Sequence, residues 1–162
     1  MGLSIHYRGR ISNVDRIVEL RRYLYQFAKQ VEWQRLDLTG LDDSRMLEII
    51  LYPPGGCEPV FFLFDSQGYL RPPDAPRAGE RNEPLWCSVE TAYGPLDAHV
   101  QIVELLRQIQ REFIPGLEVA DETGYWETEN LEKLRSARRR LRRRGIGPFR
   151  SEPRFVRISR LA

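Results

Sequence analysis

Two segments with a helical repeat of apolar residues are separated by strand-like segments, and this order limits the fold more than any other feature of the sequence. Apolar residues recur every three or four positions over residues 14–31 and again over residues 96–113, so each segment predicts an amphipathic helix. Such a helix has to bury its apolar stripe against another element. The chain therefore predicts helices packed on a sheet.

Six segments have the alternation or the composition of strands. Residues 3–11 alternate between apolar and polar side chains, which indicates a half-buried strand. The stretch PPGGCEP, residues 53–59, predicts a hairpin loop built on proline and glycine. The six predicted strands are residues 3–11, 33–39, 45–52, 60–65, 85–93 and 117–122.

The order of these elements is that of an α+β protein. It predicts a two-layer sandwich with a ferredoxin-like β-α-β-β-(β-β)-α-β core, one inserted hairpin and an added basic C-terminal helix. Phe61 to Phe64 are apolar without alternation, so we expect that strand to be covered on both faces, by the C-terminal helix or by a second subunit of a homodimer. Residues 70–84 are rich in proline and charge and predict a long surface loop.

The net charge of +2 conceals a division between the body of the chain and its C-terminal part. Residues 131–162 hold twelve basic and two acidic residues, a net charge of +10, whereas the rest of the chain holds 13 basic and 21 acidic residues, a net charge of −8. We therefore divide the chain into an α+β domain, residues 1–130, and an arginine-rich helix with a C-terminal arm, residues 131–162. Such asymmetry is typical of an interacting tail.

The arginine-rich helix is predicted to carry apolar and charged side chains on different sides. A narrow apolar stripe at helical spacing consists of Leu131, Leu134, Ala137 and Leu141. The predicted polyanion-binding surface consists of Arg135, Arg139, Arg140, Arg142, Arg143 and Arg144. Like charges on one helix repel each other, so solvent, the acidic body of the protein or a foreign polyanion must offset that repulsion.

Three interpretations of this charge remain open. A charge run is usually a solvated face, and here it can also dock on the protein's own acidic body as a purely structural tail. Alternatively the helix contacts nucleic acid, with Tyr125 and Trp126 beside it as stacking platforms, although no nucleic-acid-binding motif accompanies the run. The third partner is an acidic protein surface. We expect a non-enzymatic binding or interaction domain.

An enzyme is the alternative class, and the two histidines are its first candidates. His6 lies on the polar side of the first predicted strand, and His99 lies in the first turns of the second long helix. A histidine beside carboxylates can pass protons or bind a divalent metal. The other candidates for a metal-dependent or hydrolytic site are therefore Glu90, Asp121, Glu122, Glu58 and Cys57. Their spacing matches no catalytic or metal-binding motif, so we expect no metal site and no cofactor.

The composition indicates a cytoplasmic protein. The N-terminus has no secretory apolar region, and no apolar run approaches the ~20 residues of a membrane-spanning helix, so we expect no membrane partner. The two cysteines, Cys57 and Cys87, are too few for a disulfide framework and would remain thiols in the cytosol.

Four stretches of the sequence form a recognisable set. They are HYRGRI at 6–11, PPGGCEPVFFLFD at 53–65, SVETAYGPLDAHVQIVELLR at 88–107 and GYWET at 124–128. Together they resemble an uncharacterised family of small bacterial proteins, and the resemblance extends to about Leu134. It implies a bacterial, cytoplasmic, single-domain protein. It implies no activity, substrate, cofactor or functional residue, and the charged tail lies outside it.

Overall fold

The computed structural model describes residues 3–75 and 82–144 and shows a mixed α+β architecture, as predicted. The strands are β1 (Ser4–Arg8), β2 (Gln34–Asp37), β3 (Arg45–Tyr52), β4 (Val60–Asp65), β5 (Leu70–Arg71), β6 (Cys87–Glu90) and β7 (Glu118–Asp121). The helices are α1 (Ile17–Gln30), α2 (Leu96–Glu112), α3 (Tyr125–Thr128) and α4 (Leu131–Arg143), and the 3₁₀ turn η1 (Val14–Arg16) leads into α1.

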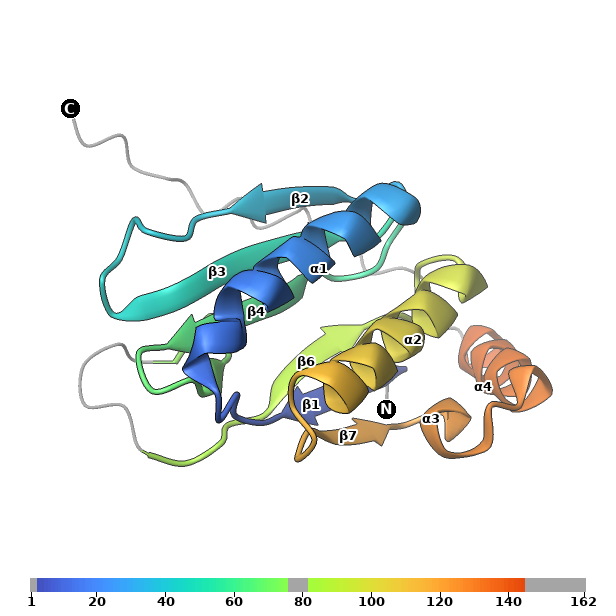
Figure 1. Cartoon of the computed structure of the whole chain (residues 1–162). Helices are drawn as coiled ribbons and strands as arrows, with labels where there is room; N and C mark the ends of the chain where they lie inside the picture. The colour runs from blue at the N-terminus through green and yellow to red at the C-terminus, as the bar shows by residue number, and fades with distance from the viewer. Residues whose placement is uncertain (1–2, 76–81, 145–162) are drawn as a thin grey trace.

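Hydrogen bonds divide the strands into two antiparallel sheets (Figure 1). One sheet has the order β6-β1-β7, and the other has the order β2-β3-β4-β5. An isolated bridge between Arg10 and Tyr69 links the segment after β1 to the start of β5. The predicted ferredoxin-like core is not confirmed, because β4 and β6 contact each other without forming the ladder that would join the two sheets.

The core lies between the sheets and the two long helices, which cover the same face of the strands (Figure 1). Ile5 and Tyr7 of β1 face this core and are fully buried, whereas His6 between them is partly exposed. From the helices, Leu24 of α1 and Leu106 of α2 are also fully buried. Each such apolar side chain contributes about 1.5–3 kcal/mol through its removal from water. The alternation of β1 therefore decides which polar groups remain accessible.

Three local details complete the description of the fold. The side chain of Asn13 accepts the backbone N–H of Asp15 and caps the start of the first helical segment. Residues 70–84 were predicted to be loop throughout, but they begin with β5, because that short strand pairs with β4. Tyr125–Thr128 form the short helix α3.

Helix α4 begins as predicted and packs through one side only. The side-chain oxygen of Asn130 accepts two backbone N–H groups of the first turn, at 3.0 and 3.2 Å, and so caps the helix. Leu134 is fully buried, whereas Leu131 is 40% exposed, so the apolar contact is narrower than predicted. α4 lies beside the start of α2 and does not cover β4 (Figure 1). The predicted arm, residues 145–162, lies outside the described residues.

The helices that the structure describes also bear on the prediction that the protein has no membrane partner. None of them combines the length and the apolar character that a bilayer-spanning segment requires.

Candidate anion-binding groove and histidine networks

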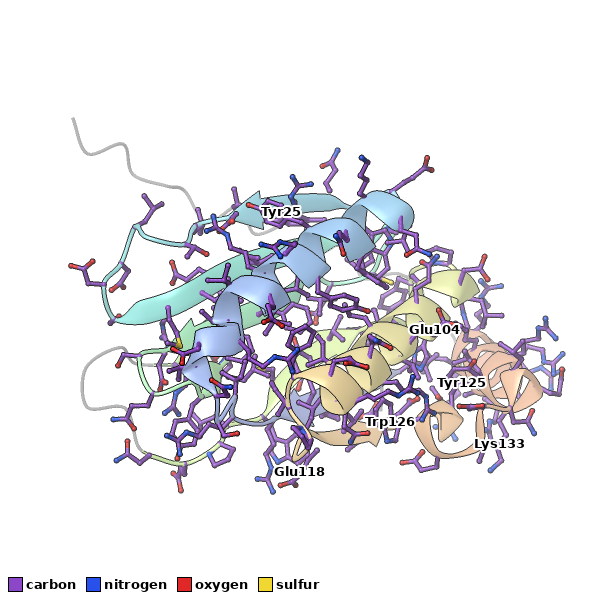
Figure 2. All side chains as sticks on the ribbon, viewed as in Figure 1. Tyr25, Glu104, Glu118, Tyr125, Trp126 and Lys133 are labelled. Atoms are coloured by element: carbon purple, nitrogen blue, oxygen red, sulfur yellow. The ribbon has the colours of Figure 1, made fainter. Side chains whose placement is uncertain are left out.

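A groove with a volume of about 420 Å³ separates α4 from the start of α2. Its lining consists of Pro95, Leu96, Arg135, Arg138, Arg139 and Arg142. No carboxylate is among these described lining residues. Many nitrogen-tipped side chains of α4 point away from the rest of the molecule (Figure 2). Four arginines of one helix therefore line one side of a space that is open to solvent.

The protein's own acidic groups neutralise little of the charge on α4. Glu132, in the first turn of the same helix, accepts a hydrogen bond from Arg139 and lies 3.8 Å from Arg135. Across residues 3–75 and 82–144, no acidic side chain from outside α4 forms an ion pair with this helix. Within that part of the chain, Arg140 and Arg143 therefore form no ion pair, and their charges are exposed to solvent.

Arg138 fastens α4 to the loop that precedes α2. Its guanidinium donates a hydrogen bond to the backbone carbonyl of Gly94. Burial and the neighbouring charge of Arg142 lower the pKa of Arg138. The charged form of this half-buried side chain is therefore less stable than that of an exposed arginine. Gly94 has to be glycine, because a Cβ at this position would lie 2.1 Å from the Sγ of Cys57. The close approach holds the PPGGCEP loop against the start of α2.

The two aromatic residues that were predicted to stack with bases have other partners. Tyr125 is 9% exposed, and its ring meets the ring of His99 edge to face, with 6.2 Å between the centroids. The guanidinium of Arg107 lies 4.5 Å from the ring centroid of Trp126 and also donates to the Trp126 carbonyl. Tyr125 therefore has little surface for a nucleobase, and Trp126 already holds an arginine against its ring.

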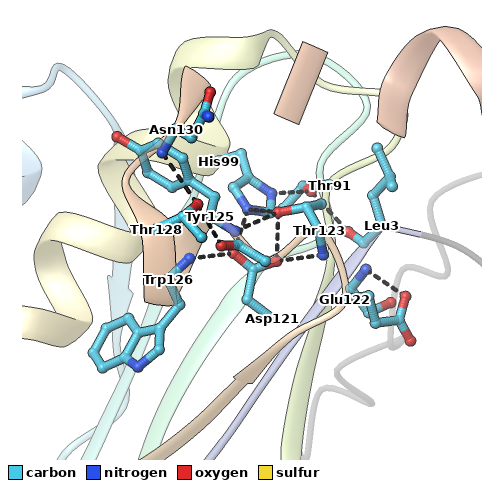
Figure 3. Close-up of polar contacts among 12 residues, drawn as sticks. Leu3, Thr91, His99, Asp121, Glu122, Thr123, Tyr125, Trp126, Thr128 and Asn130 are labelled. Carbon is cyan, nitrogen blue, oxygen red and sulfur yellow. Dashed lines mark hydrogen bonds and ion pairs between the residues drawn. The ribbon is translucent and has the colours of Figure 1, made fainter. Parts of the chain in front are cut away.

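His99 lies in a buried network that connects α2, β7 and the segment after β6 (Figure 3). Its Nδ1 is 2.7 Å from Thr91 Oγ1, and its Nε2 is 3.1 Å from Asp121 Oδ2. Thr91 Oγ1 also lies 2.7 Å from the carbonyl oxygen of Leu3. An ionised Asp121 can only accept, so His99 Nε2 donates to it. Both ring nitrogens therefore have partners inside the protein.

Asp121 receives four hydrogen bonds from protein groups. Oδ1 accepts the backbone N–H and the hydroxyl of Thr123, and Oδ2 accepts from His99 and from the backbone N–H of Trp126. Burial alone would raise the pKa of Asp121, but the hydrogen bond and charge of His99, together with the bonds from Thr123, lower it. The network thus connects α2, β7 and α3, and both carboxylate oxygens of Asp121 accept hydrogen bonds from the protein.

His6 lies on the other face of the same sheet, in a partly exposed network. Ile5 and Asp121 are partners in the β1–β7 register, whereas His6 and Glu122 project from the opposite side. His6 Nδ1 is 2.6 Å from Ser88 Oγ, and Nε2 is 3.2 Å from Glu122 Oε1. An ionised Glu122 can only accept, so Nε2 carries a proton. In the neutral imidazole, Nδ1 then accepts the Ser88 hydroxyl.

The predicted catalytic candidates therefore do not form one site. His6 and His99 lie on opposite faces of the sheet, and each has its own acidic partner. Glu90 lies on the face of His6, where it accepts the backbone N–H groups of Leu3 and of a neighbouring residue. Burial raises the pKa of the Cys57 thiol to about 11. Among the residues that the structure describes, no three His, Cys, Asp or Glu side chains are grouped as metal ligands.

Several residues of these sites carry no signal in the sequence. Ser88 lies opposite His6 only because of the β1–β6 register, and Pro95 and Leu96 become part of the groove only because α4 returns to the start of α2. The alternation of residues 87–90 could have shown that Ser88 faces outward, but not which side chain it meets. No protein-family model, curated protein or solved structure matches the chain, so the function is argued from geometry.

Proposed function

We propose that the protein binds nucleic acid through α4 and the groove beside it. The observation that carries the proposal is the set of four arginines around one groove, with Glu132 as their only acidic partner among the described residues. Arginine donates two parallel hydrogen bonds to a phosphate and remains charged at any physiological pH. A surface with several exposed cations is best complemented by a polymer that carries many negative charges.

The way α4 is held supports the same function. The cap from Asn130 and the buried side chain of Leu134 fix the start of the helix, and Arg138 ties its middle to the body. A helix of 13 residues is about 20 Å long, which is the length of several phosphate spacings along a strand. Contacts from arginine to phosphate carry no sequence information, so binding of this kind is expected to be independent of sequence.

The test is the salt dependence of binding to a labelled 20-base-pair DNA duplex, followed by fluorescence anisotropy. If six arginines contact phosphates, log K against log salt concentration falls with a slope near −5. We also expect retention on heparin at about 0.15 M salt. A slope near zero, or absence of binding at about 0.05 M salt, would overturn the proposal.

Two charge-matched variants separate the role of α4 from that of net charge. R140Q/R143Q removes two exposed charges from α4, and R22Q/R111Q removes two exposed charges from α1 and α2. The first variant should reduce the magnitude of the salt slope by about 2, because each lost phosphate contact counts for about 1. The second variant should keep the slope of the wild type. Equal reductions in both would assign binding to general electrostatics and not to this helix.

A second candidate function, hydrolysis of small esters, is favoured by one specific contact. The exposed Ser88 hydroxyl lies 2.6 Å from His6 Nδ1, and Glu122 orients the other ring nitrogen. Hydroxyl, imidazole and carboxylate thus follow one another as in serine hydrolases, with the roles of the two ring nitrogens exchanged. The measurement is the hydrolysis of p-nitrophenyl acetate. S88A should abolish it, whereas S4A, which removes a hydroxyl bonded to Glu90 on the same face, should not. Equal rates in the two variants would exclude this function.

A further inference from the structure

One face of α4 differs from the rest of the helix because it lines a concave space. Its four arginines are Arg135, Arg138, Arg139 and Arg142, at positions i, i+3, i+4 and i+7, which share one side of a helix. Arg140 and Arg143 belong to other sides and are exposed. The helix therefore offers two kinds of cationic surface, a groove and a convex face.

The cations of the groove are unevenly balanced across the face of the helix. On one edge of this face, Glu132 pairs with Arg135 and Arg139. On the other edge, Arg138 and Arg142 are one helical turn apart, and within the described residues neither pairs with a carboxylate. Two like charges at such a distance destabilise each other, the more so where one is half-buried. An anion bound between them would remove this repulsion.

The size and the second wall of the groove indicate what kind of anion it accepts. A volume of about 420 Å³ lies in the range of small-ligand sites, about 300–1,000 Å³, and exceeds what a bare phosphate needs. The wall opposite the arginines, Pro95 and Leu96, is apolar. A phosphomonoester carries about −1.5 to −2 charges at pH 7 and three acceptor oxygens, whereas each phosphate within a chain carries one charge. A projecting terminal group also enters a concave space more easily than the middle of a strand.

We propose that this groove is a phosphomonoester site, which holds the terminal phosphate of a nucleotide or of a 5′-phosphorylated strand between Arg138 and Arg142. The attached nucleoside contacts Pro95 and Leu96. This inference rests on the proposed function, because it names the group that the same helix binds. The convex arginines, such as Arg140, then follow the backbone of the strand beyond its end.

The test compares one 12-nucleotide DNA strand, labelled at its 3′ end, with a 5′-phosphate and with a 5′-hydroxyl. We expect the phosphorylated strand to bind about tenfold more tightly, because charge-assisted hydrogen bonds are added at one point. Equal affinities would overturn the phosphomonoester site and leave nucleic-acid binding intact. If neither strand binds, both proposals fall.

Competition with small molecules identifies the source of the phosphate. dTMP should displace the phosphorylated strand, and thymidine at the same concentration should not. If dTMP binds as tightly as the strand, a free nucleotide is the ligand, whereas weaker binding of dTMP points to the end of a nucleic acid. Displacement by thymidine as effective as by dTMP would contradict a site built around phosphate.

A matched pair of variants locates the site on the helix. R142Q removes a charge from the groove, and R143Q removes the same charge from the neighbouring position outside it. R142Q should reduce the preference for the 5′-phosphate from about tenfold to less than about threefold. R143Q should weaken both strands by a similar factor and keep the preference. R138Q should act like R142Q, and its urea midpoint shows whether loss of the bond to Gly94 also loosens the fold. A preference that survives in both groove variants would overturn the assignment.

Discussion

His99 and Asp121 form a buried hydrogen-bonded pair in which Nε2 lies 3.1 Å from Oδ2 and the side chains are 1% and 0% exposed. The pair joins α2 to β7, and Thr91 and Thr123 occupy the remaining polar atoms of the two side chains. Asp121 Oδ2 also accepts the backbone N–H of Trp126. Removal of one partner therefore leaves the other as an unpaired buried group, which is far more costly than the net worth of the pair.

Asp121→Asn should destabilise the protein by about 3–5 kcal/mol, because an amide replaces a buried carboxylate that pairs with His99 and accepts four hydrogen bonds. The measurement is the free energy of unfolding from urea titration. Glu122→Gln is the matched control. It changes the adjacent carboxylate, which is partly exposed and pairs with His6, and should cost about 1 kcal/mol or less. Similar losses in the two variants would show that the buried pair has no special role.

Asp37 gives the stability of the protein a defined pH dependence. Burial opposes its ionisation, but hydrogen bonds from Thr39, Tyr25 and Arg21 outweigh burial and lower the pKa of Asp37 to about 2. The unfolded chain takes up this proton near pH 3.9. The contribution of Asp37 is therefore complete above about pH 4 and is lost as the pH falls towards 2.

Asp37→Asn should remove this contribution, roughly 2 kcal/mol at pH 6. The free energy of unfolding, measured by urea titration at several values between pH 2 and pH 6, should rise less steeply with pH in the variant than in the wild type. The slope that remains comes from other carboxylates with a lowered pKa, Asp65 and Asp121 among them. Parallel curves for the two proteins would contradict the hydrogen-bonded state of Asp37.

The features that could be predicted from the sequence are those with a local cause. The outward position of His6 follows from the period of two in β1, and the capping of α4 by Asn130 follows from the preference of asparagine for helix starts. The buried side of α4 was predicted only in part. Leu134 is buried because it meets the body, whereas Leu131 has the same periodicity and stays exposed.

The features that could not be predicted depend on residues far apart in the chain. Periodicity does not show that Thr91 and Asp121 would meet the two ring nitrogens of His99. Nor does it show that the strands form two separate sheets. β4 and β6 contact each other without pairing, and this depends on how the two strands are placed relative to each other. The groove likewise requires the return of α4 to Pro95. Such contacts arise from register and packing, which no short window of sequence contains.

Both thiols should be unreactive at neutral pH. Burial raises the pKa of Cys57 to about 11 and the pKa of Cys87 to about 12, compared with about 8.5 for a free cysteine. At pH 7.5 the thiolate fraction of Cys57 is then about 300-fold below that of an unstructured peptide. Alkylation by iodoacetamide, followed by mass spectrometry, should be slower than that of glutathione by a similar factor. Labelling of Cys57 at the glutathione rate would mean that its loop opens away from Gly94.

Leu134→Ala should separate the docking of α4 from its charge. Leu134 is the one buried residue of this helix, and its truncation costs about 2–5 kcal/mol where a core side chain is lost. Because the other contacts of α4 are few, we expect the helix to detach locally while the sheets and α2 stay folded. Hydrogen exchange of the α4 backbone amides should accelerate by about 30-fold or more.

The preference for a 5′-phosphate should disappear with the groove, whereas salt-dependent binding should persist, because the arginines remain. Leu131→Ala, at a site 40% exposed, should change neither exchange nor preference. A variant at Leu134 that exchanges faster and still prefers the 5′-phosphate would show that the groove is not what selects it.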